Sequence, residues 1–179
     1  MDANGNPMLI LAIRDKSNNV IDALLNDKRI DVDLSNKSGE TPLMMASIDG
    51  NLPLVKTLVL GHKAQLDHIG WTPLHYACAK GHLEVAQFLV ANGAIVDSLS
   101  VGNTTPLMMA VQSGNEQLVK FLLDKGADLQ LKNANGLTAI DIADIYDKPW
   151  IEDGLKSRWL KLYKQAYKGP VKPTTPKSL

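Results

Sequence analysis

The chain has 179 residues, of which 45% are hydrophobic and 21% are charged, so it can form one domain with a substantial core. This composition excludes collagenous, disordered and disulfide-scaffold proteins. Nineteen basic residues balance nineteen acidic ones, so the net charge gives no general reason to expect nucleic acid or an anionic membrane as a partner. The longest apolar run near the start covers residues 8–13, well short of the roughly 18 that a membrane span needs, and we expect no membrane insertion.

The charges are unevenly distributed along the chain. Residues 148–179 carry eight basic and two acidic side chains, so this end is basic and the remainder is acidic. The single cysteine, Cys78, cannot form a disulfide within the chain and lies in an alanine-rich segment that suits a small buried side chain. We therefore expect an electrostatically polarised molecule without internal disulfides.

One eight-residue motif recurs along the chain. It reads GETPLMMA at 39–46, GWTPLHYA at 70–77, NTTPLMMA at 103–110 and GLTAIDIA at 136–143, with a fainter copy, GNPMLILA, at 5–12. The last alanines of successive copies lie 31 to 34 residues apart. A period of this length indicates stacked repeat units.

The motif and the residues after it predict two helices per unit. Threonine followed by proline starts the first helix, because the hydroxyl accepts an unpaired N–H and proline has none to lose. Glycines end these first helices, at Gly50, Gly81 and Gly114. Second runs with helical spacing of apolar residues follow at 52–60, 83–90 and 118–123, and Gly93 and Gly126 end the last two. Each hairpin can bury its apolar face only against its neighbours, so the units must stack into a short curved solenoid.

These residues resemble the ankyrin repeat family, whose pattern GxTPLHxA, then GH, then a VxxLL helix and GA is met almost letter for letter by residues 70–94. The resemblance implies an all-α ankyrin-repeat solenoid, in which helix-turn-helix hairpins carry projecting β-turn loops. The array is expected to cover residues 2–147 in about five repeats, at 2–35, 36–66, 67–99, 100–132 and 133–147 onward.

The chain departs from the family pattern in three ways. The loop before Gly70 is two residues short, which affects the third loop. Asn103 replaces a loop glycine, and asparagine is the tolerable substitute in a left-handed conformation. The histidine that His75 supplies is replaced in other repeats by Met44, Met108 and Asp141. We expect these replacements to weaken the polar tethers between neighbouring loops.

The repeat pattern lapses after residue 147. Ile151, Leu155 and Trp159 recur at helical spacing with basic residues on the other side, so residues 148–168 are predicted to form an amphipathic C-terminal capping helix. Residues 169–179 are rich in proline, lysine, threonine and serine, a composition that predicts a disordered basic tail.

Two residue patterns raise the alternatives of a metal site and a catalytic site. All four histidines lie within about twenty residues and close to Cys78, which suggests a zinc site; they are His62, His68, His75 and His82. However, two of them occupy positions where the family places histidine for hydrogen bonding, and no CxxC or HxxxH pair exists, so no metal is expected. Acidic pairs at 141/144 and 152/153 are expected on solvated helix faces, without a nucleophile motif or phosphate loop. We therefore predict neither an enzyme nor a cofactor.

The remaining candidate is a surface. The resemblance implies that the loop tips and the exposed side of each first helix form a concave face that binds proteins. Large apolar residues expected there as anchors are Trp71, Tyr76, Met45, Met109, Ile69 and Ile142, and an expected polar rim consists of Lys37, Glu40 and His68. The alternative is that these apolar side chains only cover the gaps between first helices.

We therefore expect a non-catalytic interaction module that binds one folded protein partner and is monomeric when free. The array is similar to small exported bacterial ankyrin proteins, which implies a periplasmic inhibitor or immunity (self-protection) factor acting on a cell-wall peptidoglycan hydrolase. Met1 directly before Asp2 and Ala3 is expected to replace a cleaved signal peptide. The alternatives are a cytoplasmic adaptor or a secreted effector scaffold and, in another class, an enzyme or metal sensor that uses the histidine cluster.

Overall fold

The computed structural model describes residues 5–170, and within them it contains ten α-helices, one π-helical segment and no strand. The first helices of the repeats are α1 (Met8–Arg14), α3 (Pro42–Ile48), α5 (Pro73–Ala79), α7 (Pro106–Ser113) and α9 (Ala139–Ile145). The second helices are α2 (Asn18–Leu25), α4 (Leu52–Lys56) continued by the π-helical η1 (Thr57–Gly61), α6 (Leu83–Ala91), α8 (Glu116–Asp124) and α10 (Pro149–Tyr163).

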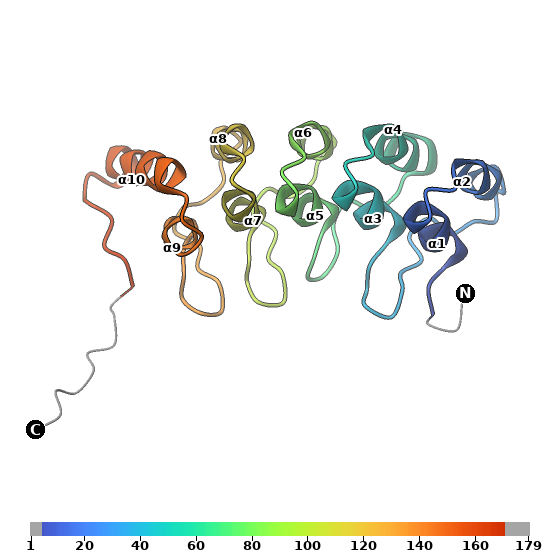
Figure 1. Ribbon diagram of the computed structural model, residues 1–179, viewed down its shortest axis with the longest axis horizontal. Coiled ribbons are helices and arrows are strands. Elements are labelled where there is room, and N and C mark those ends of the chain that lie inside the picture. The colour runs from blue at the N-terminus through green and yellow to red at the C-terminus, as the bar shows by residue number, and fades with distance from the viewer. Residues whose placement is uncertain (1–4, 171–179) are drawn as a thin grey trace, which may run out of the picture.

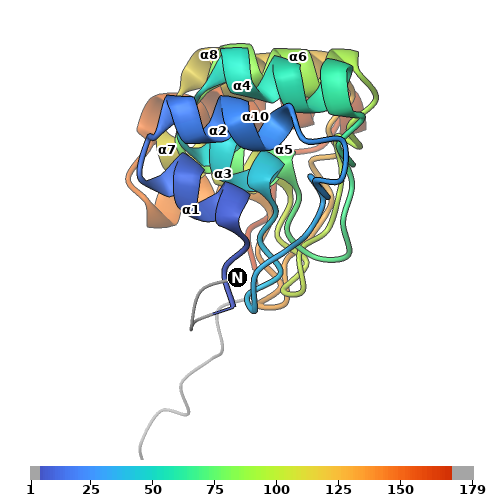
Figure 2. The same cartoon turned by 90° about the vertical axis from the view of Figure 1, so that its right-hand side faces the viewer.

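The helices form two rows, which Figure 1 shows side by side along the longest axis of the molecule. First helices occupy one row and second helices the other, and the connecting loops extend away from the row of first helices. The end-on view in Figure 2 shows that these loops lie beside one another on one side of the stack. The predicted solenoid of helical hairpins is confirmed.

Threonines begin four of the first helices, as predicted. The hydroxyls of Thr41, Thr72, Thr105 and Thr138 each accept a backbone N–H three residues later in the chain. Proline occupies the first turn of α3, α5 and α7, where it lacks an N–H that the helix could not have paired. These caps fix where each first helix begins, and therefore which residues of its first two turns face the loops.

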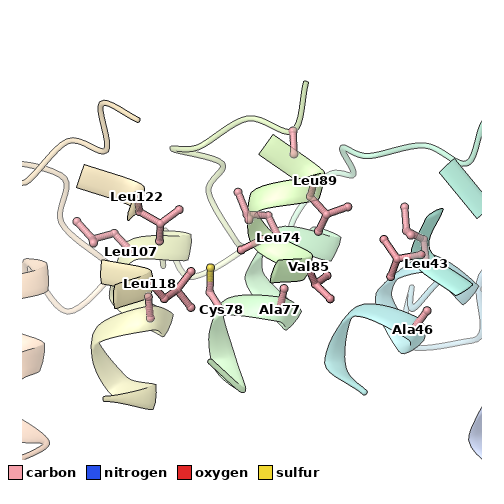
Figure 3. Close-up of a cluster of buried hydrophobic side chains, with 14 of the residues drawn as sticks. Leu43, Ala46, Leu74, Ala77, Cys78, Val85, Leu89, Leu107, Leu118 and Leu122 are labelled. Atoms are coloured by element: carbon pink, nitrogen blue, oxygen red, sulfur yellow. The ribbon is translucent and has the colours of Figure 1, made fainter. Parts of the chain in front are cut away.

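The core lies between neighbouring hairpins. Leu74, Val85 and Leu89 of the third repeat are fully buried between the second and fourth repeats (Figure 3). The last alanine of the motif is also fully buried, as at Ala77, and its small side chain lets adjacent first helices approach closely. Cys78 is buried in the same cluster, in agreement with the small buried side chain expected there.

The second repeat contains one extra helical residue, which the sequence did not reveal. Ten residues separate Leu54 from Ala64, whereas nine separate the equivalent Val85 from Ala94. The extra residue is absorbed by η1, because a π-helical turn holds one more residue than an α-helical turn. Lys63, with a φ of 59°, takes the left-handed position that glycine occupies in the next two repeats.

The loop of the third repeat is correspondingly shorter than predicted. Six residues separate Ala64 from Gly70, whereas nine separate Ala94 from Asn103, so the loop lacks three residues and the helix has gained one. We call the long loops before α3, α7 and α9 the fingers. In each, a backbone N–H donates to the carbonyl four residues later and closes a tight turn, from Asn36 to Glu40, from Ser100 to Thr104 and from Asn133 to Leu137. The third repeat has no equivalent pair, and its loop is visibly shorter than its neighbours (Figure 1).

The C-terminal cap is a helix followed by a docked segment, and not one helix over residues 148–168. α10 ends at Tyr163, and Lys164 adopts a left-handed conformation that turns the chain. Tyr167 then returns to the last repeat and donates its hydroxyl to Asp141 at 2.6 Å. Its ring also packs edge-on against Trp159. Most of the predicted tail, residues 171–179, lies outside the described residues.

Candidate binding surface

Trp71 stands at the centre of the concave side of the array. It directly follows Gly70, and the shortened loop leaves it without the backbone partner that the equivalent residue has in a finger. Its side chain is 41% exposed. Its ring packs edge-on against His75 and Tyr76, with centroid separations of 5.3 and 6.3 Å. The ring is therefore held in place from one side and open on the other.

Two cavities flank this tryptophan. The smaller, of about 240 Å³, is lined by Ile48, Trp71, His75, Tyr76, Ala79 and Met109. The larger, of about 400 Å³, extends from Trp71 and Met109 towards the fingers of the fourth and fifth repeats. Its lining includes Thr104, Gln112, Asn133 and Asn135. No carboxylate, lysine or arginine lines either cavity. The smaller cavity is thus apolar, and the larger adds amide and hydroxyl groups.

Tyr76 connects this centre to the second repeat. Its hydroxyl donates to Glu40 Oε1 at 3.2 Å, while Asn36 donates its amide to Glu40 Oε2 at 2.8 Å. Burial, together with the nearby Glu40 carboxylate, raises the pKa of Tyr76 to about 12. The phenol therefore stays protonated at neutral pH and remains a hydrogen-bond donor, which fixes the orientation of Glu40.

His75 lies buried beneath the ring of Trp71. Its Nδ1 accepts the backbone N–H of Thr72 at 3.2 Å, so its Nε2 carries the proton and donates to the carbonyl of Thr104 at 2.9 Å. Burial lowers the pKa of this histidine, which keeps the ring neutral. The residue thus caps its own helix and ties the third repeat to the fourth finger.

His82, at the start of the second helix α6, also joins neighbouring repeats. Its Nε2 lies 3.0 Å from the carbonyl of Ile48 in the preceding repeat. Its ring lies directly over Gly50, where an added Cβ would come within 2.6 Å of the imidazole. Among residues 5–170, no three histidine, cysteine, aspartate or glutamate side chains gather in a way that could hold a metal. Burial also raises the pKa of the Cys78 thiol, which keeps it protonated.

The predicted anchors fall into three groups. Met45, Tyr76 and Met109 are half-buried in one row along the first helices, and Trp71 lies over this row. Ile69 is fully exposed at the tip of the short loop, with the half-buried His68 beside it in the chain. Of the predicted polar rim, Glu40 joins this centre through Tyr76, whereas the exposed Lys37 packs against Gly5 at the neighbouring finger.

Ile142 differs from the other predicted anchors. It is only 9% exposed and belongs to the core, where it lines the larger cavity without projecting into solvent. Its short β-branched side chain cannot reach outward as methionine or tyrosine does at the equivalent positions. The sequence analysis missed Ile145 and Tyr146, which are 58% and 43% exposed and line the same cavity. The signal for them was an apolar pair at the end of α9, where the third and fourth repeats carry Ala79–Lys80 and Gln112–Ser113.

The prediction that Asp141 lies on a solvated helix face is wrong. This carboxylate is 8% exposed and accepts hydrogen bonds from the backbone and hydroxyl of Thr138, both at 2.8 Å, and from Tyr167. It occupies the position of His75 in the last repeat, where no later finger can be its partner. Tyr167 supplies the missing group, so Asp141 has a structural role in the cap.

Stacked pairs of helices, with threonine caps on four first helices, define a repeat protein of the solenoid class. Three overlapping matches to the family model for ankyrin repeats in three copies cover residues 9–100, 50–133 and 94–148. The chain therefore belongs to the ankyrin repeat family, whose repeats are a protein–protein interaction module. No helix within residues 5–170 is long and apolar enough to span a membrane.

Curated relatives share this region with much longer proteins. The chain is 39% identical over 104 residues to mouse ankyrin repeat and SAM domain-containing protein 6, which covers 56% of the chain and 12% of that protein. It is 32% identical over 113 residues to the ankyrin repeat protein nuc-2 of Neurospora crassa, covering 62% of the chain and 10% of that protein. It is 37% identical over 86 residues to mouse protein phosphatase 1 regulatory subunit 12A, covering 47% of the chain and 8% of that protein.

Proposed function

We propose that this chain binds a folded protein through its concave surface, with Trp71 as the central anchor. The observation that carries the proposal is the position of Trp71, a large and partly exposed ring that separates two uncharged cavities. A tryptophan held by neighbouring rings loses little side-chain entropy on binding and offers a large apolar area. Residues of this kind at the centre of a contact surface contribute most of the binding free energy.

The short third loop supports this proposal through shape. The residues equivalent to Trp71 in the long fingers, Glu40, Thr104 and Leu137, are half-buried, whereas Trp71 beside the shorter loop is exposed. The uncharged lining favours a partner segment that presents an apolar side chain flanked by backbone or amide groups. A charged side chain in these cavities would lose its hydration without gaining a counter-ion.

Site-specific photo-crosslinking tests the proposal. A photoreactive amino acid at Met109 lies on the concave side, whereas the same group at Gln87 lies on the exposed side of α6 and serves as the matched control. In extract of the source organism, we expect one protein to be crosslinked from position 109 and not from position 87. Calorimetry with that purified protein is then expected to show binding that Trp71→Ala weakens about thirtyfold. Equal crosslinking from both positions, or unchanged affinity of the variant, would refute the concave site.

A narrower form of the proposal names the partner as a peptidoglycan hydrolase in the periplasm, which the chain would inhibit. It extends the expectation, drawn from residues 70–77 and 104–110, that the chain resembles small exported bacterial ankyrin proteins. Purified chain added to the hydrolases of the source organism is expected to slow the lysis of cell walls by one of them, and Trp71→Ala is expected to restore lysis. The competing adaptor or effector role predicts binding to a protein without any loss of hydrolase activity.

A further inference from the structure

The helix α10 carries apolar side chains that the array does not cover. Only Ile151 and Leu155 of its 15 residues are buried. Trp150 is 78% exposed and Leu160 is 53% exposed, although both are large apolar residues. Exposed apolar groups on a helix whose other face is already packed indicate a second contact surface.

Trp150 borders a groove between α8 and α10. The groove has a volume of about 570 Å³, and its apolar lining includes Val119, Leu123 and Leu155. Trp150 and Lys161 line it on the α10 side. Arg158 spans it at one end, where its guanidinium donates to the carbonyl of Leu123 at 2.7 Å. The groove is therefore a defined feature of the second-helix row.

Gly154 and Ser157 give the groove its width on the α10 side. Glycine in the interior of a helix costs about 0.5–1 kcal/mol relative to alanine. Among residues 5–170, no contact requires this glycine, because a Cβ built at position 154 would meet no atom within 4 Å. The small residue therefore leaves open space on this face of α10.

On this face of α10, residues at equal distances before and after Ser157 have complementary size or charge. Gly154 and Leu160 lie three residues on either side of it, and Asp153 and Lys161 lie four. The pairs are small with large and acidic with basic. Residues at equal distances from a centre face each other when two identical helices pack antiparallel about a two-fold axis.

We propose that a second copy of this chain docks on this face, with the two α10 helices antiparallel and the axis at Ser157. Leu160 of each copy then enters the space left by Gly154 of the other, and Asp153 pairs with Lys161 twice per dimer. Among residues 5–170, neither of these two charged side chains forms an ion pair, whereas Glu152 and Arg158 of the same helix are both paired. The free charges are thus the ones that this packing uses.

The dimer would not occupy the concave surface. α10 belongs to the row of second helices, whereas the fingers extend from the row of first helices (Figures 1 and 2). Both surfaces can therefore be occupied at once, and one dimer would present two copies of the concave site. This proposal departs from the monomer expected from the sequence alone.

Sedimentation equilibrium of the whole chain over a range of concentrations tests the proposal. We expect the mass to rise from one chain towards two as concentration increases. Asp153→Lys and Lys161→Asp are each expected to weaken the dimer about tenfold, because each reversal places like charges opposite one another twice. The double variant is expected to restore it. Lys132→Asp, in an exposed loop, makes the same change of charge as Lys161→Asp. It is the control and should leave the dimer unchanged.

Gly154→Gln adds a test of packing. The added side chain meets nothing within the monomer but fills the space that the second copy needs, so dimerisation should be lost while the monomer keeps its melting temperature or gains stability. A single-chain mass at about 1 mM protein, a double charge variant that fails to restore the dimer, or a dimer that Gly154→Gln leaves intact would each overturn the proposal.

Discussion

Replacing Trp71 with alanine separates a binding role for this side chain from a packing role. Fully burying a large apolar side chain contributes about 1.5–3 kcal/mol to stability. Because Trp71 is 41% exposed, slightly more than half of that contribution is present, and Trp71→Ala should lower the free energy of unfolding by roughly 1–2 kcal/mol. In a chain of this length, each kcal/mol corresponds to about 2–4 °C in melting temperature.

Leu74→Ala is the matched control for this prediction. Leu74 lies three residues further along the chain, is fully buried, and should cost about 2.7–5 kcal/mol when truncated. Scanning calorimetry of the two variants and the parent chain, at one pH and one concentration, measures the difference. If Trp71→Ala lowers the free energy of unfolding as much as Leu74→Ala does, Trp71 belongs to the core. The assignment of Tyr76 and Met109 to the binding surface would then also be refuted.

Three further substitutions test other parts of the structure. Gly154→Ala should raise the free energy of unfolding by about 0.5–1 kcal/mol in melts at low protein concentration, and a lower melting temperature would contradict the open space seen at this glycine. Tyr167→Phe should cost about 1–2 kcal/mol in denaturant titrations, because Asp141 loses a donor; an unchanged midpoint would show that residues 164–170 do not stabilise the cap. Burial lowers the pKa of His75 in the folded chain below the usual 6.5, so only the unfolded state takes up a proton as pH falls below 6.5. Stability is then complete above that pH and declines below it, and His75→Met should reduce the decline between pH 7.5 and 5.5; an equal decline in both proteins would refute this.

The repeating parts of the fold could be predicted because they depend on local chemistry. A threonine followed by proline sets a helix start wherever it occurs, and the periodic glycines and alanines fix the ends and the packing of each hairpin. The partly exposed position of Trp71 was predictable for the same reason. Trp71 follows a loop glycine and precedes a helix start, so its side chain had to leave the stack.

The parts that could not be predicted depend on contacts between distant residues. The spacing of the motifs showed a net loss of two residues before Gly70, but not that the helix gains one at η1 while the loop loses three. The burial of Asp141 depends on Tyr167, 26 residues later, which no period links to it. Ile142 occupies an outward position by register, and only the length of its side chain places it in the core.

Polar contacts join consecutive repeats along the concave side, from the second repeat to the fifth. His75 holds the carbonyl of Thr104, Tyr76 holds Glu40, and the backbone of Ala134 donates to Gly102 in the preceding finger. A surface fixed in this way before a partner arrives has few conformations to lose on binding. Association with a rigid partner is therefore expected to proceed in one step, with an association rate insensitive to single anchor substitutions, so that Trp71 governs chiefly how long the complex persists.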